Sequence, residues 1–251
     1  ERILKRRTCL VRKESGSGFS RQILAANIDY AFILSSLNAE FNLRRIERFI
    51  ALAQSGGVHP IVLLTKADLN PSAESMKHQV QRYLKNLPVE CISSATGYGL
   101  SGLDTFLKPG KSVAFLGTSG VGKSTLVNRL LGCDVQSTKS IRESDGKGRH
   151  TTSRRELFLL PSGAMVIDSP GLRENQLWTE SDGLDQSFED VLKIQDLCEY
   201  RNCSHHGEPG CAVKEALDSG LLEQDRFSNY EKLIKETKHW ESKNRIHLKQ
   251  K

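Results

Sequence analysis

The stretch FLGTSGVGKSTL, residues 115–126, decides the fold of this 251-residue chain. Residues 117–124 fit the pattern G-x-x-x-x-G-K-[S/T]; an apolar run at 112–117 leads into them, and a helical pattern follows through Leu131. A strand, a glycine-rich loop and a helix are the context in which this motif surrounds phosphate groups. The sequence therefore predicts a phosphate-binding loop at the end of a buried strand.

Each position of this loop has a chemical reason. The glycines let backbone N–H groups turn inward around a β-phosphate, and the helix N-terminus adds partial positive charge. We expect Lys123 to reach the β- and γ-phosphate oxygens as a catalytic group and Ser124 to ligate Mg²⁺. A glycine-rich turn that matches by chance is the alternative, and the flanking elements argue against it. The predicted nucleotide contacts are Gly117, Thr118, Ser119, Gly120, Val121, Gly122, Lys123, Ser124 and Thr125.

Downstream of the loop, the segment AMVIDSPG at 164–171 is an apolar strand that ends in a turn. A carboxylate at the end of a parallel strand lies beside the phosphate loop, where Mg²⁺ requires an acid. We therefore expect Asp168 near the magnesium ion and the N–H of Gly171 near the γ-phosphate. Alone, the pattern D-x-P-G would indicate only a turn, but its position after a phosphate loop favours nucleotide binding.

Upstream of the loop, two short motifs, TKAD at 65–68 and SA at 94–95, each follow a buried run. A carboxylate at position 68 can accept hydrogen bonds from the N1 and N2 donors of guanine, which adenine lacks. The lysine before it can lie along the base, and the second motif can offer a backbone N–H to guanine O6. Together they predict GTP rather than ATP. The predicted base contacts are Thr65, Lys66, Asp68, Ser94 and Ala95.

The order of these parts is reversed, since ordinary guanine-nucleotide switches place the phosphate loop before the base-reading loops. The termini of compact domains often lie close together, so joining them and opening a new break preserves the site. Strands that alternate with helices indicate a parallel sheet. The sequence thus predicts an α/β fold: a circularly permuted P-loop GTPase domain, with a mainly parallel sheet and helices on both faces.

The polar segment 133–155 is long for a connector and suits a switch. A residue that orients the attacking water is needed, because Leu172 stands where Ras-like enzymes place a glutamine. His150 is our hypothesis for this catalytic role, and a surface histidine in a basic loop is the alternative. Thr151 or Thr152 is expected to ligate Mg²⁺ and sense the γ-phosphate. The pattern does not decide between them, and we take Thr151 as the working hypothesis.

Three cysteines and a histidine lie close together in Cys198-x4-Cys203-x-His205-x5-Cys211. This Cys₃His set is typical of a closed structural zinc site with no position left for a catalytic water. His206 is an adjacent competitor for the histidine position, and three free thiols in a loop are the alternative to a metal site.

The permuted order, with GTSGVGKSTL, GRHTTS at 148–153, DSPG and the cysteine–histidine cluster, resembles the YjeQ/RsgA family of ribosome small-subunit-dependent GTPases. The resemblance implies an N-terminal OB-fold, a permuted GTPase domain and a C-terminal zinc domain, and it implies His205 as the ligand. Only about twenty residues precede the GTPase pattern, whereas an OB-fold needs five strands. We expect a linker or OB-fold remnant at 1–22, the GTPase domain at 23–184 and a helical zinc-binding domain at 185–251.

The resemblance also implies a GTP hydrolase that acts late in small-subunit assembly, with GTP or GDP, Mg²⁺, the subunit and its rRNA as partners. A net charge of +6, a pI near 9.0 and a basic helix at about 227–248 agree with an RNA partner. The alternatives are an RNA-binding GTP sensor and a non-ribosomal phosphohydrolase with a structural zinc domain. We expect a cytoplasmic monomer without membrane contact. Thr65 stands where GTPases commonly have asparagine, which predicts weaker bracing of that loop.

Overall fold

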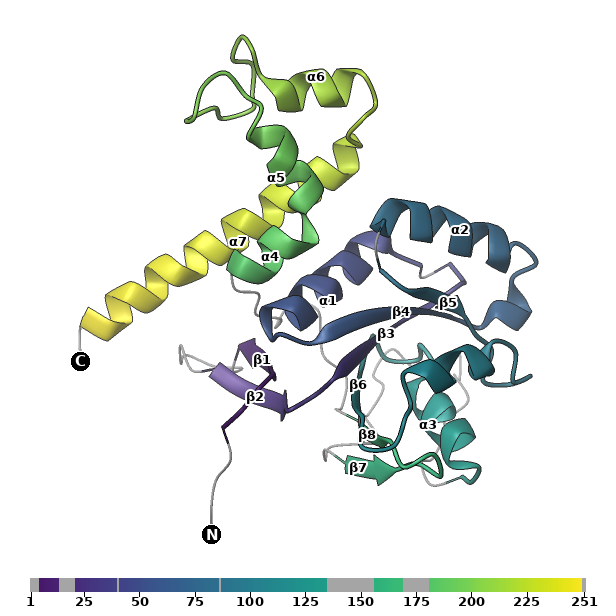
Figure 1. Cartoon of the computed structure of the whole chain (residues 1–251). Coiled ribbons are helices and arrows are strands. Elements are labelled where there is room, and N and C mark those ends of the chain that lie inside the picture. The colour runs from purple at the N-terminus through teal and green to yellow at the C-terminus, as the bar shows by residue number, and fades with distance from the viewer. Residues whose placement is uncertain are drawn as a thin grey trace, which may run out of the picture. The chain divides into compact units, whose positions relative to one another are not determined.

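The computed structural model describes residues 5–13, 21–39, 41–85, 87–134, 156–168 and 181–249. The chain divides into two compact units, Glu1–Leu177 and Trp178–Lys251, and each is described by itself (Figure 1). The division lies N-terminal to the boundary predicted at 184/185. Among the described residues, no helix is both long and apolar enough to cross a membrane.

The first unit is built on a six-stranded sheet with the order β5-β4-β3-β6-β8-β7. Every neighbouring pair is parallel except β7 and β8, which are antiparallel. The strands are β3 (Tyr30–Ser36), β4 (His59–Thr65), β5 (Val89–Cys91), β6 (Ser112–Leu116), β7 (Glu156–Leu159) and β8 (Met165–Asp168). The helices are α1 (Leu43–Ser55), α2 (Ala73–Leu84) and α3 (Lys123–Leu131), with 3₁₀ turns η1 (Ala67–Leu69) and η2 (Leu100–Thr105).

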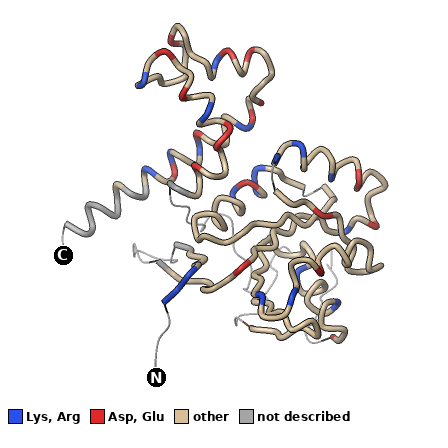
Figure 2. Tube along the Cα trace, in the orientation of Figure 1, with Lys and Arg blue, Asp and Glu red and all other residues tan. Residues whose placement is uncertain are grey.

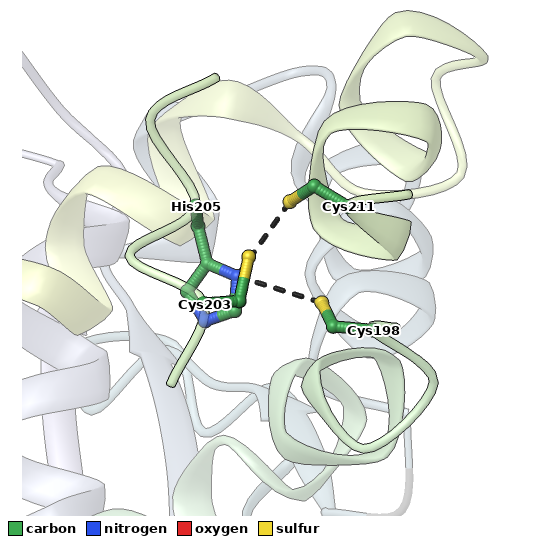
Figure 3. A group of neighbouring side chains, drawn as sticks. All are labelled: Cys198, Cys203, His205 and Cys211. Atoms are coloured by element: carbon green, nitrogen blue, oxygen red, sulfur yellow. Dashed lines mark hydrogen bonds between the residues drawn. The ribbon is translucent and has the colours of Figure 1, made fainter. Parts of the chain in front are cut away.

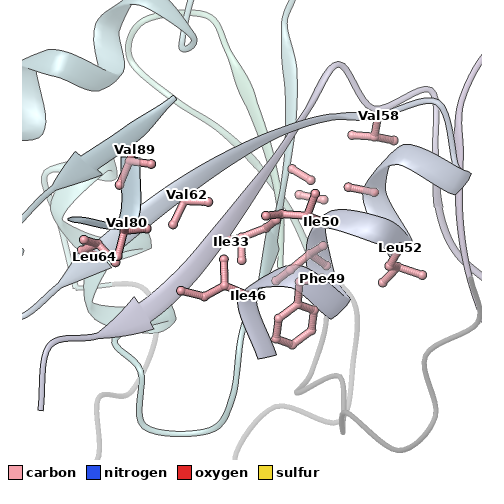
Figure 4. Packing of buried hydrophobic residues seen from close by; sticks show 14 of the residues in the cluster. Ile33, Ile46, Phe49, Ile50, Leu52, Val58, Val62, Leu64, Val80 and Val89 are labelled. Atoms are coloured by element: carbon pink, nitrogen blue, oxygen red, sulfur yellow. The ribbon is translucent and has the colours of Figure 1, made fainter. Parts of the chain in front are cut away.

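Both faces of this sheet are covered. Alternate residues of a strand point to opposite faces, so each strand contributes side chains to both cores. On one face, Ile33 and Val62 pack with α1 and α2 residues such as Phe49 (Figure 4). On the other, Phe32 and Phe115 pack with residues of η2 and α3. The near-continuous apolar character of β3, β4 and β6 follows from this double burial. The predicted mainly parallel sheet with helices on both faces is confirmed.

The chain order of the strands explains the permutation. Starting at β6 and passing through β7 and β8 to β3, β4 and β5 would place the phosphate loop first and the base-reading loops last. Here β3 opens the sheet instead, and the segment between β5 and β6 joins the two halves. Leu103 and Leu107 in that segment are buried in the core, so the joint is a packed part of the domain.

An antiparallel ribbon of β1 (Cys9–Lys13) and β2 (Arg21–Ala26) precedes the sheet. Leu10 and Leu24 of the ribbon are buried in the core cluster around α1. The backbone N–H of Cys9 donates to the carbonyl of Gly56 at 2.9 Å, just beyond the end of that helix. Only a linker or OB-fold remnant is predicted over 1–22 from the residue types, because these short strands lie among charged and glycine-rich residues.

The second unit consists of α4 (Ser181–Ser187), α5 (Glu189–Gln195), α6 (Ala212–Asp218) and α7 (Gln224–Lys249). Arg226 of α7 joins the first two helices to the last. Its guanidinium donates to both carboxylate oxygens of Asp190, at 2.9 and 2.7 Å, and to the carbonyl of Ser187 at 2.9 Å. It also lies over the ring of Phe188. This bidentate pair fixes the helices around a small core.

Candidate nucleotide site and metal centre

All described parts of the predicted nucleotide site lie at one edge of the sheet. The TKAD motif follows β4, Ser94 and Ala95 follow β5, the phosphate loop follows β6, and Asp168 ends β8. Because these four strands run in parallel, their carboxyl ends share an edge, which is where open α/β sheets bind ligands. The structure thus brings together segments as far apart in the chain as Thr65 and Asp168.

The backbone of the phosphate loop requires glycine at its two ends. A Cβ at Gly117 would lie 2.8 Å from the carbonyl oxygen of Leu34 on β3, so the loop could not pass so close with a larger residue. Gly122 has a φ of +104° and directly precedes α3, a conformation that L side chains rarely adopt. Helix α3 has nine residues and begins directly after Gly122, so the N–H groups of its first turn lie at the loop.

Lys123, the first residue of α3, is folded back over the phosphate loop. Its Nζ donates to the carbonyls of Gly117 and Thr118, both at 2.6 Å. Burial lowers the pKa of this amine to about 8, and the negative charge of Asp168 acts in the opposite direction. Asp168 is itself buried and is paired in register with Phe115 of β6, directly before the loop. A bound phosphate group would bring further negative charge to this amine.

The base-reading and phosphate-binding loops are joined by a buried hydrogen bond. The hydroxyl of Thr65 donates to the carbonyl of Val121 at 2.8 Å. Both residues are buried, at 4% and 2% exposure, so water does not replace this bond. Threonine at position 65 was expected to brace the base-reading loop less well than asparagine. The side chain of Thr65 nevertheless makes a hydrogen bond to the phosphate loop.

The two base-reading loops are also held to each other. The N–H of Ala67 donates to the carbonyl of Ile92 at 3.2 Å, and Lys66 before it has a left-handed φ of +59°. Asp68 follows in η1 with its side chain exposed, where it can meet a base. These contacts hold the two loops together, and the roles of both motifs in base binding stay predictions.

Sequence reasoning missed two residues that shape the second base-reading loop. Ser93 is fully buried, and its hydroxyl accepts from the N–H of Thr96 at 3.2 Å. Its backbone N–H donates to the carbonyl of Tyr98 at 2.9 Å. The hydroxyl of Tyr98 in turn donates to Glu74 of α2 at 2.7 Å. A polar residue at the end of the apolar run VECIS was the available signal.

Several predicted site residues lie outside the described part of the chain: Gly171, His150, Thr151 and Thr152. Their roles stay predictions. Ser124 and Thr125 are described and lie in the first turn of α3, next to the phosphate loop. Their contacts with a nucleotide stay predictions.

The four predicted metal ligands come together in the second unit (Figure 3). The ligand atoms of Cys198, Cys203, His205 and Cys211 all lie within 4.8 Å of one another. Nδ1 of His205 is 3.6 Å from the sulfur of Cys198 and 3.7 Å from that of Cys211. Burial lowers the pKa of His205, which favours the neutral imidazole that metals bind. This cluster could hold a metal ion.

The structure separates the two adjacent histidines that the spacing left open. His205 points into the thiol cluster, and its ring packs edge-on against Phe227 of α7. The imidazole of His206 lies 3.4 Å from the carboxylate of Glu231 and is 63% exposed. Only His205 therefore belongs to the cluster.

The long helix α7 has a packed side and a charged side. Phe227, Tyr230, Leu233 and Thr237 are buried at a spacing of three to four residues. Lys232, Lys235 and Lys238 are exposed. Positive and negative residues are interspersed along this helix (Figure 2), so the exposed side is mixed in charge. The helix predicted at about 227–248 is present in the structure, and its RNA contact stays a prediction.

The permuted sheet, the phosphate loop and the motifs predicted to read guanine define a circularly permuted P-loop GTPase that carries a helical unit with a Cys₃His cluster. A sequence model of the RsgA GTPase family matches residues 3–178. The chain belongs to this family.

Curated relatives and solved structures agree with this membership. The chain is 45% identical over 236 residues, 94% of its length, to small ribosomal subunit biogenesis GTPase RsgA 2 of Vibrio vulnificus. It is 46% identical over 235 residues, 93% of its length, to small ribosomal subunit biogenesis GTPase RsgA of Opitutus terrae. It spans only 68% and 64% of these relatives' own lengths.

Among solved structures, YjeQ from Thermotoga maritima matches with a TM-score of 0.68 and 27% identity, covering 94% of this chain and 77% of that one. The structure of YloQ, described as a circularly permuted GTPase, matches with a TM-score of 0.59 and 27% identity, covering 86% and 70%. The circular permutation deduced from the order of the motifs is confirmed by this likeness.

Proposed function

We propose that this chain binds and hydrolyses GTP as a biogenesis factor of the small ribosomal subunit, and that the subunit stimulates the hydrolysis. The observation that carries the nucleotide assignment is the convergence of the TKAD motif, the phosphate loop and Asp168 at one sheet edge. The ribosomal part rests on the family and on the names of its curated members.

Each described residue has a defined task in this proposal. Asp68 accepts hydrogen bonds from guanine N1 and N2. Lys123 leaves the loop carbonyls and donates to the β- and γ-phosphate oxygens, while the N–H groups at the start of α3 face the phosphates. Ser124 would ligate Mg²⁺ with the carboxylate of Asp168 close to the ion, and the bound ion would neutralise charge between the phosphates.

The remaining catalytic assignments come from residues outside the described part of the chain. We propose that His150 orients the attacking water and that Thr151 ligates Mg²⁺ in the GTP state, with the N–H of Gly171 at the γ-phosphate. An enzyme with Leu172 in the place of the usual glutamine is expected to hydrolyse GTP slowly until a partner completes its site.

We propose that the metal in the second unit is one structural zinc ion. Bonds of about 2.3 Å to sulfur and about 2.0 Å to nitrogen in a tetrahedron place sulfur and nitrogen about 3.5 Å apart. The separations of 3.6 and 3.7 Å at His205 support this geometry. Four protein ligands leave no open position, so the ion would stabilise a small unit with little core of its own.

The proposed partner implies a cytoplasmic location, and we propose a monomer without membrane contact.

The test is GTP hydrolysis by the purified chain, alone and with purified small ribosomal subunits, with ATP as the control nucleotide. Slow hydrolysis of GTP that the subunit strongly raises would support the proposal. GTP binding without stimulated turnover would favour a GTP sensor instead. Because the chain spans about two thirds of its relatives, the same assay with a full-length relative separates a missing activating segment from a wrong assignment.

A further inference from the structure

We propose that Glu208 is a positioning residue for the metal ligand His205, and that it fixes the imidazole among the thiols before a metal ion binds. This inference rests on the proposed metal site, but it does not depend on the GTPase activity. Glu208 is not one of the four ligands, and it acts through the backbone on both sides of the histidine.

The carboxylate of Glu208 bridges the two residues that flank His205. Its Oε1 accepts from the N–H of Ser204 at 2.8 Å, and its Oε2 accepts from the N–H of His206 at 3.1 Å. An ionised carboxylate accepts both bonds at full strength, and such charge-assisted bonds are stronger than neutral ones. A hydrogen bond from the side chain of Ser204, with further bonds from the backbone N–H groups of Glu208, Ser204 and His206, lowers the pKa of Glu208 to about 2, so the carboxylate is ionised at neutral pH.

The backbone of His205 shows why this bridge is needed. His205 has a φ of +62°, in the left-handed region that non-glycine residues seldom occupy and that surrounding structure must maintain. This conformation directs Nδ1 to the sulfurs of Cys198 and Cys211. If the loop relaxed to an ordinary φ, the imidazole would turn away from both sulfurs.

Other contacts of the loop do not replace the bridge. His206 is tied to Glu231 of α7 through its side chain, and Phe227 packs against the edge of the His205 ring. Neither contact satisfies the two N–H groups that Glu208 holds. The carboxylate therefore sets the backbone, while the ring contacts only limit where the imidazole can turn.

The test uses the whole chain and measures metal affinity by competition with a chromophoric chelator, for Zn²⁺ and for Co²⁺. Glu208→Gln keeps the shape of the side chain but replaces one acceptor oxygen with a donor, so one N–H loses its partner. The matched control is Glu189→Gln, which makes the same chemical change at an exposed i,i+4 ion pair with Lys193 in the same unit. The same change is then repeated in a His205→Ala background, where no imidazole is left to position.

We expect Glu208→Gln to weaken Zn²⁺ binding by about 10- to 100-fold, the usual cost of losing a group that orients a ligand. The Co²⁺ complex should keep the absorption of a tetrahedral site, and Glu189→Gln should bind as the parent chain does. In the His205→Ala background the effect should disappear. An unchanged affinity, or the same loss with and without His205, would overturn the proposal. A parent chain that binds neither metal would instead remove the metal site itself.

Discussion

The substitution Thr65→Val tests whether the base-reading and phosphate-binding loops act as one unit. Valine has nearly the same volume and shape as threonine, so no cavity forms, but the hydroxyl that donates to the carbonyl of Val121 is lost. That carbonyl is then buried without this donor. Leaving a buried acceptor unsatisfied costs about 1–3 kcal/mol.

Part of this cost is expected in nucleotide affinity. The bond fixes the phosphate loop relative to Asp68, so without it the loops must be ordered when the nucleotide binds. The full cost would correspond to about 5- to 150-fold in Kd, and we expect about a tenfold weaker Kd for GDP, which is ~1.4 kcal/mol. The free energy of unfolding of the empty chain should fall as well. Both are measured on the same samples, by calorimetric titration and by urea unfolding.

Two controls make the result decisive. Thr8→Val removes another threonine hydroxyl of the same unit, which donates to the carbonyl of Ile28 at 2.7 Å, away from the nucleotide loops. It should lower stability and leave the Kd unchanged. Thr65→Ser keeps the hydroxyl and should restore most of the affinity. If Thr65→Val lowers stability but binds GDP like the parent chain, the bond supports only the fold and the reasoning is refuted.

Three further predictions concern the two sites. Because the pKa of Lys123 is lowered to about 8 in the empty site and phosphates would raise it, the Kd for GDP should be constant below pH 8. Above pH 8 the Kd should rise by up to tenfold per pH unit. Calorimetry in buffers of different ionisation heat should show that binding takes up a proton, and a Kd that stays constant to pH 9 would contradict this. Asp68→Asn should exchange guanine for xanthine nucleotides, since an amide can donate to the O2 of xanthine, and competition binding with GDP and XDP measures this; an unchanged preference for GDP would place the base elsewhere. Chelation of the proposed zinc ion, or Cys211→Ser, should unfold the second unit while the first keeps its GDP affinity; limited proteolysis with a parallel binding assay measures both, and a second unit that stays resistant to protease would contradict this.

A nucleotide site could be proposed from the sequence because its motifs are local. Each motif is a few residues at a strand end, and the glycines of the phosphate loop are required by backbone geometry that the residue types alone reveal. The order TKAD before GTSGVGKS was sufficient to deduce the permutation. The apolar runs before the TKAD motif and before the phosphate loop predicted β4 and β6, because strands buried on both faces have a strong signal.

Contacts between distant residues could not be predicted in this way. The bond from Thr65 to Val121 joins positions 56 apart, and no local pattern shows that a threonine will find a carbonyl there. The ribbon of β1 and β2 was missed because its short strands are stabilised by packing on α1 and not by a clear alternation of their own.

The sequence by itself determined which chemical groups this protein has and in which order: a carboxylate predicted to read guanine, then a phosphate loop, then three cysteines and a histidine at metal-ligand spacing. Only the tertiary structure decided how they act together. It showed that His205 and not His206 faces the thiols, and that Lys123 donates hydrogen bonds to the loop carbonyls. It also showed that Thr65 joins the base-reading loop to the phosphate loop. The physical reason is that residue types and spacings are local properties of the chain, whereas direction, burial and partnership arise only when distant segments pack.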